Sequence, residues 1–279
     1  MFNLKSFLVA FCVALPASAF SDDREKTLCG WFQERFMFQI WSTLAPSPDE
    51  SRVSGNDLIQ KVEFTTADGK TLKGYKYQSQ NGSGLVTHPK GYLLMALGNA
   101  MIADQTISHL AAFSQRGFDA YIFDYRGYGD SQGKRRINAF IQDYIELVSH
   151  LNAQYEKHTL YGVSLGGAVI ANVIGAGAQY DRAVIDSSPS RFSPYGCPKR
   201  IDPSANVPND ATNLLVITGA EDSVLGPDMT TEFRKLAELN GATVVDGPDY
   251  EHPFKDRTID IHKERLTRIV NFIDNSEGN

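Results

Sequence analysis

From about Gly55 to the C-terminus, short segments of strand-forming residues alternate with amphipathic segments of helical periodicity. This alternation is typical of an α/β fold, a mostly parallel sheet with helices on both faces. Asp68-Gly69 lies between the first two candidate strands, which predicts a β-hairpin there. The eight candidate strands are 61–66, 71–78, 91–97, 119–124, 158–163, 182–186, 213–219 and 242–245.

Helices are expected between these strands and at the C-terminus, because apolar residues recur there at helical spacing. The segment 187–212 is rich in Ser, Pro and Asn, which predicts a loop over one edge of the sheet, a short insertion in place of a large cap. The predicted helices are 104–116, 137–151, 165–174, 229–239 and about 259–273.

The first nineteen residues have the outline of a signal peptide. Lys5 is their only charge, an apolar run follows from 6 to 15, and Ala17-Ser18-Ala19 offers small residues for cleavage. We expect residues 1–19 to be removed on export to the periplasm or the medium; the alternative is an uncleaved N-terminal anchor. We expect the remaining chain to divide into an N-terminal extension, 20–55, and a single α/β domain, 56–279.

The extension contains an aromatic-rich segment, 29–44, with Phe32, Phe36, Ile40 and Leu44 spaced four apart. This spacing predicts a helix packed on the body of the protein, or else an element at a membrane surface or at the substrate entrance.

Two cysteines would remain after cleavage, because Cys12 lies in the signal peptide. In an oxidising compartment Cys29 and Cys197 could form a disulfide, but two buried free thiols are an equal alternative.

Composition excludes several classes of function. The formal net charge of −6 and the pI near 5.5 disfavour nucleic-acid binding, which depends on clustered Lys and Arg. The sequence lacks H-E-x-x-H and C-x-x-C, and Gly127-Tyr128-Gly129 lacks the third glycine of a dinucleotide-binding fingerprint. We therefore expect neither a metal nor a cofactor. The expected partner is a small-molecule or acyl substrate. The oligomeric state is left open.

Gly162-Val163-Ser164-Leu165-Gly166 fits the nucleophile elbow G-x-S-x-G. The motif follows a predicted buried strand and precedes a predicted helix, which is the setting that the elbow requires. A side chain at Gly162 or Gly166 would collide in so tight a turn. Ser164 is therefore the candidate nucleophile.

Together with a second motif, this elbow resembles the α/β-hydrolase superfamily from about Lys61 to the C-terminus. The second motif is Asp124-Tyr125-Arg126-Gly127-Tyr128-Gly129-Asp130-Ser131, which is similar to the D-x-R-G-x-G-x-S run of single-domain serine hydrolases. In that family the run borders the active site, so a structural role is expected for it.

The resemblance implies further site residues, because the acid and then the histidine follow the nucleophile along the chain. Asp222 is the expected acid, with Glu221 as the alternative. His252 lies in a loop after the last strand and is favoured over His262, which lies inside the last predicted helix. The expected oxyanion hole consists of the backbone N–H groups of Leu165 and Asn99.

The sequence departs from the family at Leu97, where many members have His, so the resemblance does not imply the conformation of the loop around Asn99. The implied activity is hydrolysis of carboxylic esters, with thioesters as a further class, through an acyl-enzyme. The alternatives are a peptidase or an acyltransferase using the same residues, and a non-catalytic interaction protein that retains the fold.

Overall fold

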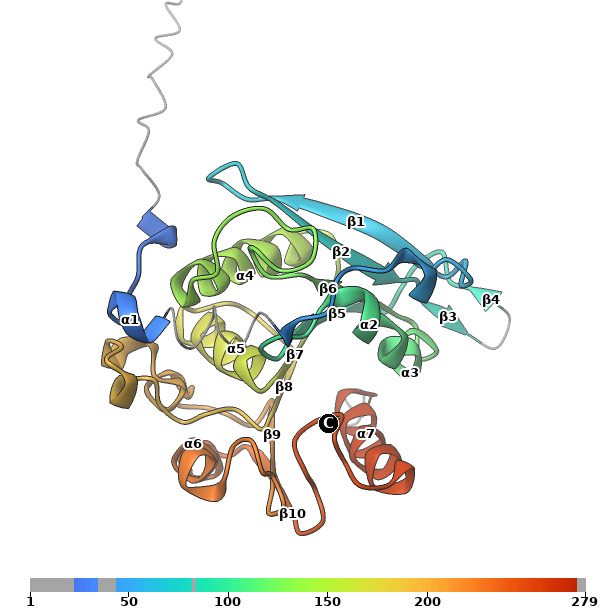
Figure 1. Cartoon of the computed structure of the whole chain (residues 1–279). Helices are drawn as coiled ribbons and strands as arrows, with labels where there is room; N and C mark the ends of the chain where they lie inside the picture. The colour runs from blue at the N-terminus through green and yellow to red at the C-terminus, as the bar shows by residue number, and fades with distance from the viewer. Residues whose placement is uncertain (1–22, 35–43, 82–83, 275–279) are drawn as a thin grey trace, which may run out of the picture.

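A computed structural model describes residues 23–34, 44–81 and 84–274 of the chain (Figure 1). Its central sheet has eight strands in the order β1-β2-β6-β5-β7-β8-β9-β10. Strand β2 is antiparallel to both of its neighbours, and all other pairs are parallel. The strands are β1 (Ile59–Thr65), β2 (Thr71–Tyr77), β5 (Gly91–Ala96), β6 (Phe118–Phe123), β7 (His158–Val163), β8 (Arg182–Asp186), β9 (Leu214–Gly219) and β10 (Thr243–Gly247).

Each predicted strand is present, and its ends lie within two residues of the prediction. The hairpin is also confirmed: Gly69 has a φ of 76°, and Thr66 N donates to Lys70 O over 2.9 Å. A small separate ribbon, β3 (Gln80–Asn81) with β4 (Gly84–Leu85), was not predicted. Its strands are two residues long, too short to show an alternating pattern.

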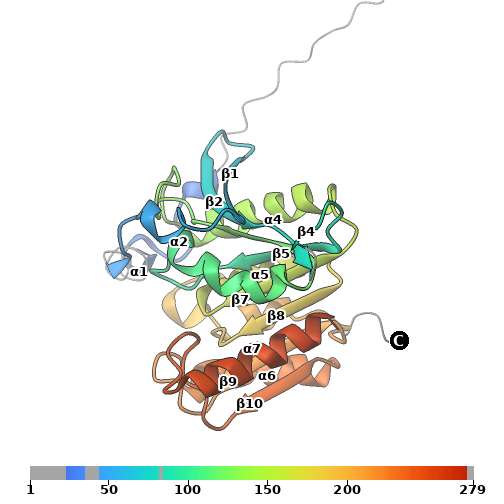
Figure 2. The same ribbon diagram turned by 90° about the vertical axis from the view of Figure 1, so that its right-hand side faces the viewer.

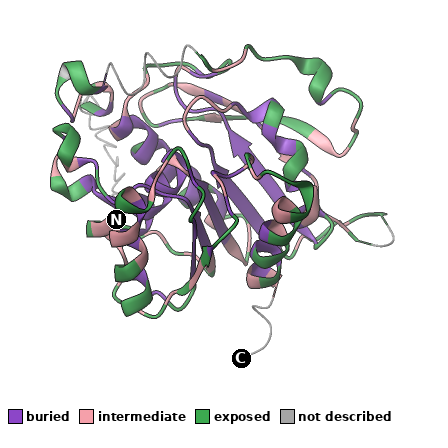
Figure 3. Cartoon of the chain, turned by 60° about the horizontal axis from the view of Figure 1, so that its bottom comes forward, coloured by how far each residue is buried: buried purple, intermediate pink, exposed green. Residues whose placement is uncertain are grey.

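Helices cover both faces of the sheet, as predicted. One face carries α4 (Ile137–Asn152), α5 (Leu165–Gly175) and α6 (Pro227–Leu239). The other carries α2 (Ala103–Thr106), α3 (Ala111–Ser114) and α7 (Ile259–Asp274) (Figures 1 and 2). The central strands lie between the two layers, and every residue of β5, β6 and β9 is buried (Figure 3).

The prediction of one continuous helix over 104–116 is wrong. A 3₁₀ helix, η5 (Ile107–Leu110), separates α2 from α3. The Thr106 hydroxyl donates to Ile102 O over 3.0 Å, and such back-bonding by a β-branched residue disturbs regular helix geometry.

The segment 187–212 is short, as predicted, but it is not a simple loop over the edge of the sheet. It forms three 3₁₀ helices, η6 (Ser193–Tyr195), η7 (Lys199–Ile201) and η8 (Pro203–Asn206), and η8 packs against α5 and α6. The buried carboxylate of Asp202 accepts hydrogen bonds from Phe192 N, Ser193 N and Ser193 Oγ. Polar contacts within the segment stabilise these helical turns. The segment therefore lacks the apolar periodicity from which helices are usually predicted.

A disulfide joins Cys29 to Cys197, which decides between the two alternatives left open by the sequence. It fastens the N-terminal extension to the 187–212 segment. Of the predicted helix 29–44, the structure describes only its beginning, α1 (Trp31–Glu34), and Leu44; residues 35–43 lie outside the described residues. The proposed signal peptide also lies outside them. Among the helices that the structure describes, none is long and apolar enough to span a bilayer.

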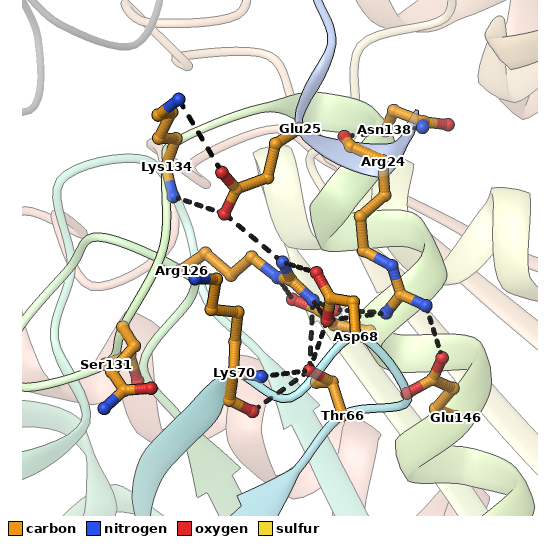
Figure 4. Close-up of polar contacts among 12 residues, drawn as sticks. Arg24, Glu25, Thr66, Asp68, Lys70, Arg126, Ser131, Lys134, Asn138 and Glu146 are labelled. Carbon is orange, nitrogen blue, oxygen red and sulfur yellow. Dashed lines mark hydrogen bonds and ion pairs between the residues drawn. The ribbon is translucent and has the colours of Figure 1, made fainter. Parts of the chain in front are cut away.

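Arg126 is the centre of a buried ionic network that attaches the extension to the domain (Figure 4). Its guanidinium group is fully buried and forms two hydrogen bonds with Asp143 of α4, at 2.6 and 2.7 Å, and two with Asp68 of the hairpin, at 2.6 and 2.5 Å. Arg24, in η1 (Asp23–Glu25), also pairs with Asp143, at 3.0 Å. Burial raises the pKa of Asp143 to about 6 despite these two arginines, which indicates how strongly the site is desolvated.

Replacing Arg126 should therefore destabilise the protein strongly. In Arg126→Met the buried carboxylates would lose their main counter-charge, and we expect a loss of about 3–5 kcal/mol in the free energy of unfolding, measured by urea denaturation. Arg257→Met is the matched control, because Arg257 is exposed and pairs with Glu221 and Glu251 at the surface. It should leave the free energy of unfolding close to the wild-type value, because exposed ion pairs contribute little to stability. Equal losses in the two variants would contradict the role assigned to the network.

Candidate active site

The carboxyl ends of the parallel strands β5 to β10 meet at one edge of the sheet, where ligands bind in open α/β folds. The loops that leave this edge carry the predicted site residues. Asn99 follows β5, Ser164 follows β7, Asp222 follows β9 and His252 follows β10. Chain segments far apart in the sequence are thus brought to one place by the parallel topology.

Ser164 occupies a sharp turn between β7 and α5. Its φ and ψ are 55° and −118°, a strained conformation for a residue other than glycine. The flanking glycines are sterically required, as predicted: a Cβ at Gly162 would lie 2.4 Å from Gly166 O, and one at Gly166 would lie 2.0 Å from Ala96 O. The backbone N–H of Ser164 donates to Asp186 O over 2.9 Å.

Asp222 and His252 form a buried pair. His252 Nδ1 lies 2.9 Å from Asp222 Oδ2 and 3.1 Å from Oδ1, and Oδ1 also accepts hydrogen bonds from Val224 N and Leu225 N. Burial alone would raise the pKa of Asp222, but the hydrogen bonds from His252 and the backbone outweigh it and the pKa is lowered. The carboxylate is therefore ionised at neutral pH and can stabilise positive charge on the imidazole.

The alternatives that the sequence left open lie elsewhere. Glu221 is exposed and pairs with Arg257 at 2.6 Å. His262 lies in α7, where its Nδ1 is 3.7 Å from an oxygen of Asp256. Neither one takes part in the Asp222–His252 pair.

Among the described residues, no hydrogen bond connects Ser164 to His252. Ser164 is partly exposed at the turn, whereas His252 is 9% exposed. Hydrogen bonds of this kind are often long in ligand-free enzymes and shorten when the substrate binds.

The expected oxyanion donors lie beside the serine. Leu165 is the first residue of α5, so its N–H has no partner within the helix. A Cβ at Gly98 would lie 3.6 Å from Ser164 Cβ, which places the loop that contains Asn99 next to the nucleophile. The following residue, Ala100, has a φ of 61° and donates from N to Asn99 Oδ1 over 3.1 Å.

Two tyrosines hold this loop; the sequence predicted a structural role for their segment as a whole but no specific contact for either of them. Tyr125 donates from its hydroxyl to Leu97 O over 2.9 Å, and Tyr128 donates to Asn99 Oδ1 over 2.5 Å. Both belong to the 124–131 segment, at its variable positions. Leu97, where many family members have His, thus contributes its carbonyl as an anchor of the loop.

Arg265 of α7 also has a role at the site that the sequence did not predict. It is 2% exposed, donates from Nη2 to Glu251 O over 2.7 Å, pairs through Nη1 with Asp256 at 3.1 Å and stacks 4.4 Å above the Tyr250 ring. These contacts fix the loop that carries His252. The only signal in the sequence was an arginine close to the apolar stripe of the last helix.

No group of three or more His, Cys, Asp or Glu side chains in the described part of the chain is arranged to hold a metal ion.

The sheet, the serine elbow and the acid–histidine pair together define an α/β-hydrolase. Comparison with known proteins agrees with this class. Residues 87–195 match the family model described as serine aminopeptidase, S33. YfhR of Escherichia coli K12, described as uncharacterized, is 30% identical over 244 residues, which cover 80% of this chain and 84% of YfhR. The chain belongs to the same α/β-hydrolase family as YfhR.

Two further similarities are more limited. The thiohydrolase aneE of Aspergillus aculeatus is 35% identical over 134 residues, which cover 44% of this chain and 38% of that protein. The structure of an esterase from Pyrococcus furiosus, Pf2001, superimposes with a TM-score of 0.59 at 17% identity and covers 77% of this chain and 91% of the esterase. At this identity the esterase structure supports the fold alone.

Proposed function

We propose that this hydrolase cleaves carboxylic esters, and thioesters as a further class, through an acyl-enzyme on Ser164. The observation that carries the proposal is the location of a strained, partly exposed serine at the same sheet edge as the buried Asp222–His252 pair. Strain at a serine between two obligatory glycines is the mark of a nucleophile rather than of an ordinary turn.

In this mechanism His252 removes the proton of Ser164 as the hydroxyl attacks the substrate carbonyl. Asp222 holds Nδ1–H, so that Nε2 is free to act as the base. The N–H groups of Leu165 and Asn99 stabilise the oxyanion. His252 then protonates the leaving group and activates the water that hydrolyses the acyl-enzyme.

Two of the comparisons support particular substrate classes. The similarity to the thiohydrolase aneE supports thioesters as substrates, and the family description, serine aminopeptidase, supports a peptidase as the second candidate function.

Assaying the purified protein against a panel of esters, thioesters and peptides would separate these candidates. A fluorophosphonate probe should label the wild-type protein covalently. Absence of both labelling and hydrolysis would instead support a non-catalytic interaction protein.

We expect the site to favour short acyl groups. A long acyl chain gains about 0.8 kcal/mol per buried CH₂ only where an apolar wall receives it. The segment 187–212, where a lid would be inserted, is short, and its Asp202 and Asn206 side chains are used in polar contacts within the segment. The kcat/KM values for acetate, butyrate, octanoate and palmitate esters should be highest at butyrate or shorter. A maximum at octanoate or longer would overturn this prediction.

We further propose that the protein is exported and that Phe20 is its mature N-terminus. The Cys29–Cys197 disulfide supports an oxidising compartment, because such bonds are rare in proteins of the reducing cytosol. N-terminal sequencing of protein recovered from its native host tests the cleavage site. Thiol titration of the unfolded mature protein should find no free cysteine, since Cys12 would be removed. A retained Met1 with three titratable thiols would refute the proposal.

A further inference from the structure

The loop 97–101, which carries the expected oxyanion donor Asn99, lies directly beside the nucleophile. A Cβ at Gly98 would lie 3.6 Å from Ser164 Cβ. The loop belongs to no helix or strand, and a turn in which Met101 N donates to Gly98 O over 3.3 Å closes it. Regular secondary structure therefore does not set the direction of its N–H groups, and contacts with other parts of the chain must do so.

The backbone of this loop is strained at one residue. Ala100 has a φ of 61°, in the left-handed region that residues with a Cβ rarely adopt. Asn99 Oδ1 stabilises this conformation by accepting a hydrogen bond from Ala100 N over 3.1 Å. The position of the Asn99 side chain is thus coupled to the backbone of the loop. A change in the side chain would change the direction of the neighbouring N–H groups.

A second hydrogen bond to the same side-chain oxygen comes from outside the loop. The hydroxyl of the buried Tyr128 donates to Asn99 Oδ1 over 2.5 Å. The Tyr128 ring packs edge-on against Tyr125 and Phe140, with centroids 6.3 and 6.1 Å away. The guanidinium group of Arg135 lies 4.8 Å from the centre of the same ring. Because a tyrosine side chain has only two torsions, these contacts hold its hydroxyl in one place.

We propose that Tyr128 is a positioning residue for the oxyanion hole. Its hydroxyl fixes the Asn99 side chain, and the side chain fixes the loop from which the Asn99 N–H donates to the oxyanion. The proposal rests on the proposed serine hydrolase function. Tyr125 supports the start of the same loop by donating to Leu97 O over 2.9 Å. The 124–131 segment thus acts on the reaction through two tyrosine hydroxyls, neither of which has to contact the substrate.

The competing interpretation of Tyr128 is a buried hydroxyl that only stabilises the fold. Tyr92 provides the matched comparison, because it is also buried and also donates to an asparagine, Asn152 Oδ1, over 2.7 Å. Tyr92 lies near the start of β5, whereas the loop of the oxyanion hole follows the end of that strand. Tyr92→Phe therefore removes the same kind of hydrogen bond at the opposite edge of the sheet.

Tyr128→Phe removes the hydroxyl and keeps the ring. We expect kcat for the best substrate of the panel to fall about 10- to 50-fold with little change in KM, because the oxyanion exists only after Ser164 has attacked. Complete removal of an oxyanion donor costs more, about 10²- to 10³-fold. Tyr92→Phe should keep the wild-type kcat and KM. An unchanged kcat in Tyr128→Phe, or equal losses in the two variants, would overturn the positioning role.

A double-mutant cycle tests whether Tyr128 acts through Asn99. Asn99→Ala keeps the backbone N–H of the oxyanion hole but removes the side-chain oxygen that accepts the tyrosine hydroxyl. Residues that act through one contact are not additive. Adding Tyr128→Phe to Asn99→Ala should therefore lower kcat no further. If the two losses instead multiply in the double variant, Tyr128 does not act through Asn99 and the proposal fails.

Amide hydrogen exchange, measured on the whole protein by mass spectrometry, gives a readout that does not depend on turnover. Tyr128→Phe should speed exchange in peptides that cover residues 97–103, and Tyr92→Phe should leave it unchanged there. Unchanged exchange of this loop in Tyr128→Phe would overturn the proposal. If the wild-type protein neither hydrolyses any substrate of the panel nor reacts with a fluorophosphonate, the proposed function fails and the catalytic part of this proposal fails with it. The exchange data would still show whether Tyr128 fixes the loop.

Discussion

Ser164→Ala is expected to reduce ester hydrolysis by about 10⁶-fold and to abolish covalent labelling by a fluorophosphonate, while the protein remains folded. The reason is chemical: in the proposed mechanism no other group forms the acyl-enzyme. The substitution removes one oxygen atom at a partly exposed position. The alanine at position 164 can still donate its backbone N–H to Asp186 O, as Ser164 does. The loss should therefore appear in kcat rather than in stability. Steady-state kinetics and thermal unfolding measure the two quantities separately.

The matched control is Ser54→Ala, since Ser54 is exposed and lies before β1, at a distance along the chain from every proposed catalytic residue. It should keep wild-type activity and labelling. A Ser164→Ala variant that hydrolyses esters at the wild-type rate would refute the acyl-enzyme mechanism and leave the chain with only the fold of a hydrolase.

The architecture was predictable because each buried strand is a local property of the sequence. β5, β6 and β9 consist almost entirely of buried apolar residues, and such runs are visible without knowing what they pack against. Features stabilised by polar contacts were not visible. The helical turns of 187–212 depend on Asp202 accepting three hydrogen bonds, and the broken helix at 103–114 depends on a side-chain hydrogen bond of Thr106.

The candidate site divides in the same way. The turn at Ser164 could be predicted because it requires glycine at fixed spacing, and the pairing of Asp222 with His252 followed from chain order in the family that the sequence resembles. Arg265 and Tyr128 could not, because their roles depend on partners that are distant in the sequence. Arg265 acts on Glu251 and faces Asp186. No local motif encodes such a contact.

The disulfide illustrates a third limit. Because two cysteines remain after the expected cleavage, a disulfide between Cys29 and Cys197 was one of two alternatives. Only the fold could decide between a disulfide and two free thiols. The two residues are 168 positions apart, and the bond connects the extension to the segment beside α5. The same extension is attached to the domain a second time through Arg24 and Asp143.

Asp222→Asn should lower kcat/KM for esters by about 10⁴-fold, through an imidazole held in the wrong tautomer. The contacts of Asp222 explain why. Oδ1 accepts hydrogen bonds from two backbone N–H groups, Val224 and Leu225, so the single oxygen of an asparagine would take that position. Its NH₂ group would then replace Oδ2, which lies 2.9 Å from His252 Nδ1.

Facing an NH₂ donor, Nδ1 must accept, and the proton of the neutral imidazole moves to Nε2, the atom that should remove the proton of Ser164. The base is then lost although every heavy atom stays in place. Glu221→Gln is the matched control, because Glu221 is the neighbouring carboxylate and pairs with Arg257 at the surface. It should leave kcat/KM unchanged. If Glu221→Gln proves more damaging than Asp222→Asn, the acid has been assigned to the wrong residue; His252 tautomers observed by NMR in both variants would show this directly.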